Sequence, residues 1–225
     1  MPRDGTNAIG FRKEEGAMLS LMRGHQNRPP ERDFDDLVGV MRDLPQGRLG
    51  QIVNCKLHLS HTCEPAHAHT LAELSATLLA GSPLGDPVPV GWTFLTEVEL
   101  ALPRETLVIA DIAGWRVPHE RIVASPSPIG IVPEWVCEVL DPGTRTLDLT
   151  TKRQAYAIAG VKNLWILDPT ARVLEAFENL RGRWLLSLAV SEDEISAPPF
   201  GDLRFDVGDL WMPEPHHRPS HRPSA

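Results

Sequence analysis

The chain has 225 residues, 42% hydrophobic and 23% charged, which is typical of a folded domain with tails and excludes a wholly disordered chain. Its formal net charge of −8 argues against a general polyanion binder with a basic surface, although a local basic groove remains compatible with it. The absence of an apolar run of roughly 18–20 residues, the charged N-terminus and the three unevenly spaced cysteines predict a cytoplasmic protein without a membrane segment.

We expect one folded domain between two tails. Residues 1–32 mix Gly, Arg, Glu and Asn with a Pro29-Pro30 pair, which predicts a flexible leader. Residues 212–225 are rich in Pro, His, Arg and Ser and predict a disordered tail with nothing to bury. Residues 33–211 carry the periodic hydrophobic patterns and therefore form the expected domain.

The first half of this domain alternates between helical and strand-like patterns. Asn54-Cys55 lies where a tight hairpin turn would fall, and the second helix carries Leu71, Leu74, Leu78 and Leu79 on its expected buried face. The expected elements are a helix over 33–41, a hairpin over 49–60, a helix over 66–80, a loop over 85–90, strands over 91–102 and 106–113, and a loop over 115–133.

The second half begins with an apolar strand over 133–140 that contains Glu138. A turn at Asp141-Pro142-Gly143-Thr144 follows, and Gly160 ends the next helix. The remaining expected elements are a helix over 146–158, a strand over 164–167, and a hairpin of strands 172–177 and 183–190 with its turn at 179–182.

A carboxylate inside a buried strand is costly unless a metal, a cation or hydrogen bonds compensate it, so Glu138 is the first candidate for function. Asp111 lies 27 residues earlier, at the end of another apolar run. If the two strands are neighbours, these carboxylates can share a face and bind Mg²⁺ or Mn²⁺, which prefer oxygen ligands. Lys152, on the following helix, is the candidate for positioning or deprotonating an attacking water.

Each of these residues also has a simpler interpretation. Asp148 and Lys152, spaced i and i+4, can form an ordinary exposed helix pair, and Asp111 can be a strand-end cap. Glu97 and Glu99 alternate with apolar residues and predict a solvated face of a sheet. Taken together and in this order along the chain, Asp111, Glu138 and Lys152 favour a metal site.

A cluster of His and Cys residues invites a zinc site, but it lacks the paired spacing of a four-ligand set. The cluster still leaves a zinc-binding structural protein as a third hypothesis, ranked last. The cluster consists of His58, His61, Cys63, His67 and His69.

Four segments resemble the Uma-type putative restriction endonuclease family of the PD-(D/E)XK nuclease superfamily. The resemblance spans about 33–211, is most specific over 133–169 and leaves both tails outside. The segments are 48–60 (RLGQIVNCKLHLS), 107–115 (LVIADIAGW), 133–144 (PEWVCEVLDPGT) and 156–169 (YAIAGVKNLWILDP).

The resemblance implies an α/β (α+β) fold, a restriction-endonuclease-like mixed β-sheet flanked by helices, with an N-terminal and a C-terminal hairpin. It also implies Mg²⁺- or Mn²⁺-dependent hydrolysis of DNA. Asp111 would match the motif aspartate and Glu138 the (D/E) position, both as metal ligands. Lys152 would match a lysine that this family carries on the following helix. We expect Asp148, four residues earlier, to position Lys152 or the start of the helix.

This sequence departs from the family pattern at several positions. Ala110 stands where a proline usually precedes the motif aspartate, and Leu140 stands where the superfamily lysine usually lies. In the early hairpin, Gln51 replaces the glutamate and Cys55 replaces the turn glycine. The neutral Gln51 would weaken or inactivate the site if the missing glutamate helps to bind metal or to orient water.

Two functions follow from the resemblance. The first is a metal-dependent endonuclease that acts on DNA, as a homodimer by analogy with nucleases that cut both strands. The alternative is a nuclease-fold module whose catalysis has decayed and which binds nucleic acid or a protein partner. The neutral Gln51 and the acidic net charge favour the alternative, and the intact set of Asp111, Glu138 and Lys152 opposes it.

Overall fold

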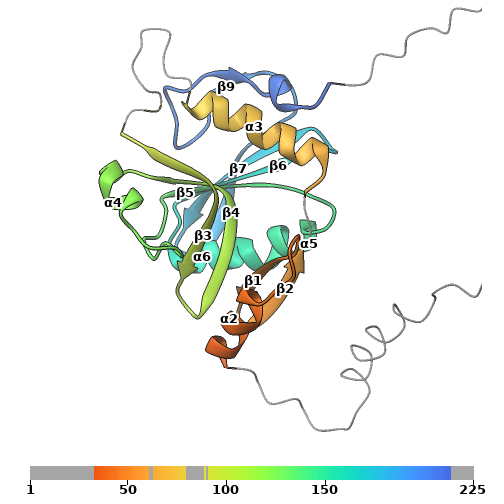
Figure 1. Ribbon diagram of the computed structural model, residues 1–225. Coiled ribbons are helices and arrows are strands. Elements are labelled where there is room, and N and C mark those ends of the chain that lie inside the picture. The colour runs from red at the N-terminus through yellow and green to blue at the C-terminus, as the bar shows by residue number, and fades with distance from the viewer. Residues whose placement is uncertain (1–32, 61–62, 80–88, 90, 214–225) are drawn as a thin grey trace, which may run out of the picture. The chain divides into compact units, whose positions relative to one another are not determined.

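An eight-stranded mixed sheet forms the centre of the fold, as the computed structural model shows (Figure 1). The structure describes residues 33–60, 63–79, 89 and 91–213. The expected leader, most of the expected loop over 85–90, and nearly all of the expected tail lie outside these residues.

The strands lie in the order β2-β1-β4-β5-β6-β7-β8, and β3 pairs with the second edge of β4. All neighbouring pairs are antiparallel except β5 and β6, which are parallel. A small second sheet consists of β9 (Glu194–Ile195) and β10 (Phe205–Asp206). The strands of the main sheet are β1 (Leu49–Val53), β2 (Lys56–Ser60), β3 (Thr93–Leu102), β4 (Thr106–Trp115), β5 (Trp135–Val139), β6 (Asn163–Asp168), β7 (Val173–Leu180) and β8 (Arg183–Val190).

Helices cover both faces of the sheet, and each face has its own hydrophobic core (Figure 1). On one face, α3 contributes Leu74 and Leu78 to a core that also contains Trp135 and Trp165. On the other face, α6 packs Tyr156 against the alternate residues of the same strands. The helices are α2 (Phe34–Arg42), α3 (Pro65–Leu79), α4 (His119–Val123), α5 (Arg145–Leu147), the π-helix η1 (Asp148–Lys152), α6 (Arg153–Ala159) and the 3₁₀ helix η2 (Val207–Leu210).

This architecture confirms the predicted mixed sheet flanked by helices, with one hairpin near each end of the domain. The prediction that Asn54-Cys55 forms a tight turn is confirmed as well, because both residues have left-handed φ angles of 50° and 55°. Gly160, with φ 91°, ends α6 as expected. No described helix is both long and apolar enough to cross a membrane.

Several details of the prediction were wrong. The expected loop over 115–133 contains the short helix α4, and Leu79 is exposed instead of buried. Asp111 does not end its strand, because β4 continues to Trp115 through pairing with β3 and β5. The small sheet and η2 were not expected, because two-residue strands and a single helical turn carry no periodic pattern.

One edge of β4 is shared by two strands, and this arrangement creates the site described below. β3 pairs along one edge of β4 from Thr106 to Trp115, with a break at Asp111. On the other edge, β1 pairs only at Leu107, and β5 pairs only from Ile112 to Gly114. The backbone between these two contacts therefore faces a gap in the sheet, and it needs side chains as hydrogen-bond partners.

Candidate active site

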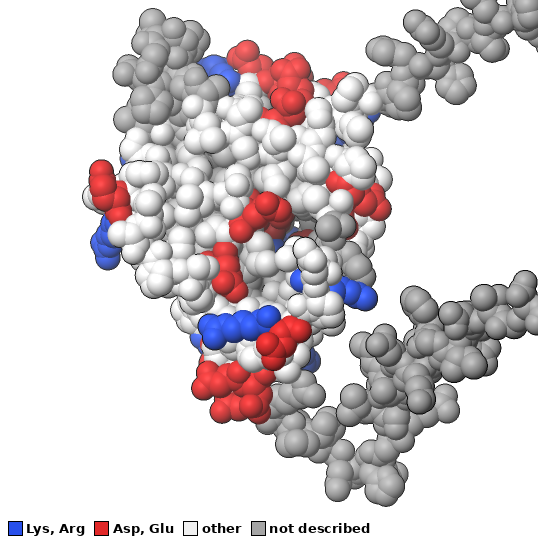
Figure 2. Space-filling view, in the orientation of Figure 1, with Lys and Arg blue, Asp and Glu red and all other residues white. Residues whose placement is uncertain are grey.

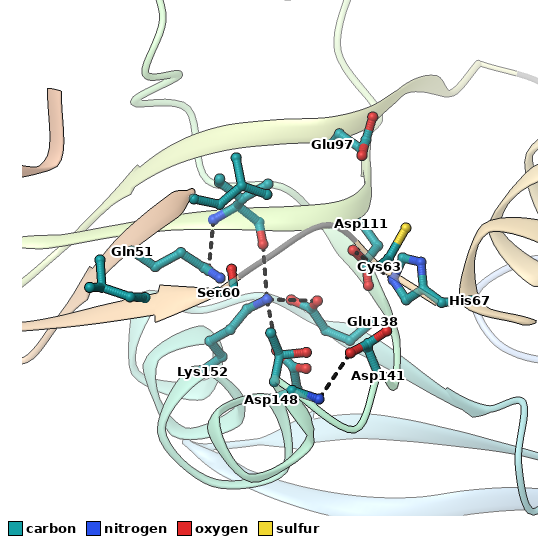
Figure 3. A pocket seen from close by; sticks show the side chains of 15 residues that line it. Gln51, Ser60, Cys63, His67, Glu97, Asp111, Glu138, Asp141, Asp148 and Lys152 are labelled. Atoms are coloured by element: carbon teal, nitrogen blue, oxygen red, sulfur yellow. Dashed lines mark hydrogen bonds and ion pairs between the residues drawn. The ribbon is translucent and has the colours of Figure 1, made fainter. Parts of the chain in front are cut away.

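A pocket of about 490 Å³ lies at this gap in the sheet (Figure 3). Strands β1, β4 and β5 contribute to its wall together with η1 and the start of α3. The structure brings together all five residues singled out from the sequence, since each of them lines the pocket. They are Gln51, Asp111, Glu138, Asp148 and Lys152.

Lys152 joins the carboxylates of the pocket. Its Nζ lies 2.7 Å from Glu138 Oε2 and 3.0 Å from Asp148 Oδ1, and it donates to the carbonyl oxygen of Ile109 at 2.9 Å. The Lys152 and Asp148 side chains are each 3% exposed, so the interpretation as an ordinary exposed helix pair is wrong. Their turn is π-helical, a form that often occurs at functional sites.

The carboxylates keep Lys152 protonated. Burial alone would lower the pKa of Lys152, but Glu138, Asp148 and Asp111 outweigh burial and raise the pKa above its ordinary value. A protonated ammonium group donates hydrogen bonds and has no lone pair with which to accept a proton. Lys152 can therefore orient a water molecule or stabilise negative charge, but it cannot act as a general base at neutral pH.

Glu138 is 1% exposed, and both of its oxygens have a donor. Oε2 accepts from Lys152, and Oε1 accepts from the hydroxyl group of Tyr156, the one tyrosine of the chain, at 2.5 Å. Burial raises the pKa of Glu138 above its ordinary value, although Lys152 opposes the shift. Each oxygen has a second lone pair, so these hydrogen bonds fix the carboxylate without excluding a further ligand.

Asp111 lies between β5 and α3. Its Oδ2 accepts from the backbone nitrogen of Val139 at 2.7 Å, and its Oδ1 lies 3.4 Å from His67 Nε2. Burial alone would raise the pKa of Asp111, but His67, Lys152 and the hydrogen bond from Val139 together lower it. Asp111 is therefore an ionised carboxylate inside the pocket.

Gln51 fills part of the gap in the sheet. Its Oε1 accepts from the backbone nitrogen of Ile109 at 2.9 Å, while Lys152 donates to the carbonyl group of the same residue. The two side chains thus replace the strand partner that Ile109 lacks on this edge of β4. A carboxylate oxygen at position 51 could accept the same hydrogen bond, so the neutral glutamine preserves the architecture of the site.

Four other pocket residues were missed or set aside by sequence reasoning: Cys63, His67, Glu97 and Asp141. His67 did carry a signal, because it shares a helical face with Leu74 and Leu78 and is itself buried. Glu97 is exposed, as expected, but it lines the pocket and has an unusual φ of 47° within β3. Asp141 lies in the predicted turn, where a structural role was sufficient explanation.

Asp141 ties the start of α3 to the turn after β5. Its Oδ2 accepts from the backbone nitrogen of Glu64 at 2.8 Å, and its Oδ1 accepts from that of Gly143 at 2.9 Å. Glu64 immediately precedes α3, whose first turn carries His67. These hydrogen bonds therefore help to hold His67 beside Asp111.

The charges of the site suit a divalent cation. Lys152 is the one Lys or Arg among the described residues that line the pocket, against the acidic residues Glu97, Asp111, Glu138, Asp141 and Asp148. In the described part of the chain, no group of three or more His, Cys, Asp and Glu side chains is already arranged around a metal position. Mg²⁺ commonly uses only one or two protein carboxylates together with water and substrate phosphate, so Asp111 and Glu138 fit such an ion.

The face of the molecule in Figure 2 is not basic. Its Lys and Arg side chains are few and separated by acidic and uncharged ones, so that face has no continuous basic stripe. This distribution agrees with the net charge of −8. A phosphodiester substrate would therefore meet a negative site unless a cation compensates the charge.

Comparisons with known proteins agree with the fold and with its nuclease-like arrangement. A family model described as "Uma2: Putative restriction endonuclease" matches residues 56–208, more than half of the chain. A solved structure of "a putative nuclease belonging to DUF820" from Anabaena variabilis is similar, with a TM-score of 0.62 and 14% sequence identity. The similarity covers 80% of this chain and 97% of that one. No curated protein matches the chain.

Proposed function

Because the chain belongs to the Uma2 family of putative restriction endonucleases, we propose that it is a metal-dependent endonuclease that hydrolyses phosphodiester bonds of DNA. One observation carries the proposal: Lys152, held 2.7 Å from Glu138, lines the same pocket as Asp111. Burying one cation among several carboxylates costs stability in most contexts, so a catalytic role explains the arrangement better than a structural one.

In this proposal Asp111 and Glu138 hold Mg²⁺ or Mn²⁺. When bound, such a cation stabilises charge on the phosphate and lowers the pKa of a water ligand. Lys152 orients the attacking water and stabilises the negative charge that develops on the phosphate oxygens. Asp148 fixes the Lys152 ammonium group, and Tyr156 fixes the Glu138 carboxylate.

The second candidate is a nuclease-fold module that binds nucleic acid or a protein partner without cutting. The presence of Gln51 where the family pattern has a glutamate supports it. Gln51 is neutral, so position 51 adds no charge to the site. Its side chain is 6% exposed, and its amide oxygen already accepts from the backbone nitrogen of Ile109. Under this alternative, the remaining residues of the pocket keep the fold and a binding surface.

We also propose that residues 33–211 form the nuclease domain and that the protein acts in the cytoplasm. We further propose that two copies pair to cut both strands. Burial of Leu37 near one end and of Trp211 at the other supports the domain limits. Cys63 and Cys137 are free thiols, which agrees with a reducing compartment. Light scattering at micromolar concentration with and without a DNA duplex tests the homodimer, and a monomer under both conditions would contradict it.

Nicking of supercoiled plasmid tests the enzyme assignment. We expect the wild type to nick in Mg²⁺ or Mn²⁺, and Glu138→Gln and Lys152→Met to lose about 100-fold or more of the rate. Lys162→Met is the matched control, because Lys162 pairs with Glu134 on the surface and its side chain is 67% exposed.

Equal cutting by all four proteins would exclude these residues as the source of activity. Absence of cutting by any of them, together with binding of the same plasmid, would favour the non-catalytic module. Circular dichroism of each variant separates loss of chemistry from loss of the fold.

A further inference from the structure

His67 occupies a position that packing alone does not explain. It belongs to the buried face of α3, is 7% exposed, and its Nδ1 has no hydrogen-bond partner among the described residues. Its Nε2 points to Asp111 Oδ1 across the pocket (Figure 3). A buried imidazole with one unpartnered nitrogen costs stability unless the ring serves another purpose.

His67 Nε2 and Asp111 Oδ1 form a long ion pair, and their separation also fits a shared ion. The two atoms are 3.4 Å apart, longer than the usual 2.9–3.0 Å of a direct hydrogen bond. Zn²⁺, a first-row metal, binds imidazole nitrogen and carboxylate oxygen at roughly 2.0–2.2 Å. Two such bonds at angles of about 90–110° separate the two donor atoms by about 3.0–3.5 Å.

We propose that His67 Nε2 is a ligand of the same divalent cation as Asp111 and that the site therefore prefers Mn²⁺ to Mg²⁺. The inference rests on the proposed function, which supplies the cation at Asp111 and Glu138. Mg²⁺ favours oxygen ligands, whereas Mn²⁺ suits carboxylates and is the first member of the Irving–Williams series, whose affinities extend to sites that include nitrogen. The remaining coordination positions are left to Glu138, water and a phosphate oxygen.

The local structure already holds the two ligands together before any ion binds. Val139 fixes the Asp111 carboxylate through Oδ2, which leaves Oδ1 directed at His67. Asp141 accepts a hydrogen bond from the backbone nitrogen of Glu64, directly before α3, so the first turn of the helix cannot drift from the pocket without breaking it. The pair needs little reorganisation on binding, and such preorganisation favours affinity.

Binding of Mn²⁺ to the full chain, without DNA, tests the proposal directly. Electron spin echo spectroscopy detects the nitrogen of an imidazole bound to Mn²⁺, and loss of the free Mn²⁺ signal measures affinity. We expect nitrogen coupling in the wild type, and in His67→Gln we expect loss of that coupling and about tenfold or weaker Mn²⁺ binding. Mg²⁺ affinity, measured by competition, should change much less.

His69→Gln is the matched control, since His69 lies on the same helix outside the residues that line the pocket. It should keep both the coupling and the affinity. Bound Mn²⁺ without nitrogen coupling in the wild type, or with equal affinity in His67→Gln, would overturn the role of His67 while leaving the metal site intact. Failure of the wild type to bind Mn²⁺ or Mg²⁺ at all, or binding that Asp111→Asn leaves unchanged, would overturn the proposed function as well.

Discussion

At the scale of single residues, we expect the buried charge network to affect both the stability of the fold and the proposed activity. Lys152 neutralises part of the charge of Glu138 and Asp148, and all three side chains are almost completely buried. Removal of one partner from a buried ion pair leaves the other without compensation, which is more destabilising than replacement of both. Effects of mutations on catalysis here must therefore be separated from effects on the folded state.

We expect Lys152→Met to lower the free energy of unfolding by about 3–5 kcal/mol, because two buried carboxylates lose their cation. The double variant Lys152→Met with Glu138→Gln should lose clearly less than Lys152→Met alone. Urea denaturation of the three proteins and of Lys162→Met measures these differences. A Lys152→Met loss as small as that of the surface control would show that the network is not a coupled unit.

Asp168, a charged residue outside this network, should make the free energy of unfolding depend on pH. Burial alone would raise its pKa, but hydrogen bonds from Ala171, Arg145 and Thr170 outweigh burial and lower the pKa. A carboxylate with a lowered pKa in the folded state stabilises the fold above its unfolded pKa of about 3.9, and this contribution is lost as the pH falls through the folded value. The Arg145–Asp168 pair, at 2.6 Å, also fastens the start of α5 to the end of β6.

Asp168→Asn should therefore lower the free energy of unfolding by about 1–2 kcal/mol at pH 7. The difference from the wild type should shrink steadily below about pH 4. Urea denaturation of both proteins across this range measures it. A difference that stays constant from pH 7 to the acid limit would mean that the ionised carboxylate is not the stabilising form.

At the scale of secondary-structure elements, irregular segments build the site. The π-helical turn of η1 carries both Asp148 and Lys152. Near Asp111, the regular alternation of β4 side chains between the two faces of the sheet is interrupted. Ala110 and Ala113, three residues apart, pack in the same core cluster, whereas a regular strand would place them on opposite faces. Glu97, opposite this point on β3, has the left-handed φ noted above. Strain of this kind is concentrated at functional sites.

The turn between β1 and β2 offers a test of backbone strain in an element. Cys55 has φ 55°, a conformation that favours glycine, and its thiol group donates to Glu105 at 3.1 Å on the surface. We expect Cys55→Gly to raise the free energy of unfolding by about 0.5–1.5 kcal/mol. Asn54→Gly should have a smaller effect, since asparagine tolerates this conformation. A loss of stability in Cys55→Gly, measured by urea denaturation, would contradict this account.

At the scale of the whole molecule, the acidic charge should make DNA binding depend on divalent cations. The net charge is −8, and the face in Figure 2 has no continuous basic stripe. Proteins that bind DNA by phosphate neutralisation release counterions, and their affinity falls steeply with salt. A protein that approaches DNA through a metal bound in an acidic pocket should instead bind DNA more tightly when the divalent cation is present.

We expect weak binding of a DNA duplex in EDTA and binding at least about tenfold tighter when Mn²⁺ is added. A parallel titration uses Ca²⁺ in place of Mn²⁺, which should prevent cutting of the DNA during the measurement. Fluorescence anisotropy at two salt concentrations gives the affinity and its salt dependence. Tight binding in EDTA with a steep salt dependence would point instead to a basic surface outside the described residues.

The order of the main elements, and Asp111, Glu138, Asp148 and Lys152 among the charged residues of the site, could be predicted from the sequence, whereas the roles of Glu97 and Asp141 could not. Hydrophobic periodicity indicated both hairpins and the main helices, because burial of one face imposes it. The cost of a carboxylate in an apolar strand singled out Glu138, and the family resemblance connected it to Asp111 and Lys152.

How these residues meet depends on the tertiary structure. The sharing of one edge of β4 by β1 and β5 opens the gap that Gln51 and Lys152 fill, and the packing of α3 on the sheet carries His67 to Asp111. These contacts join residues 43 to 58 positions apart along the chain, and no local pattern encodes them. Local periodicity reports which face of an element is buried, whereas strand pairing and helix docking decide which buried polar groups face one another.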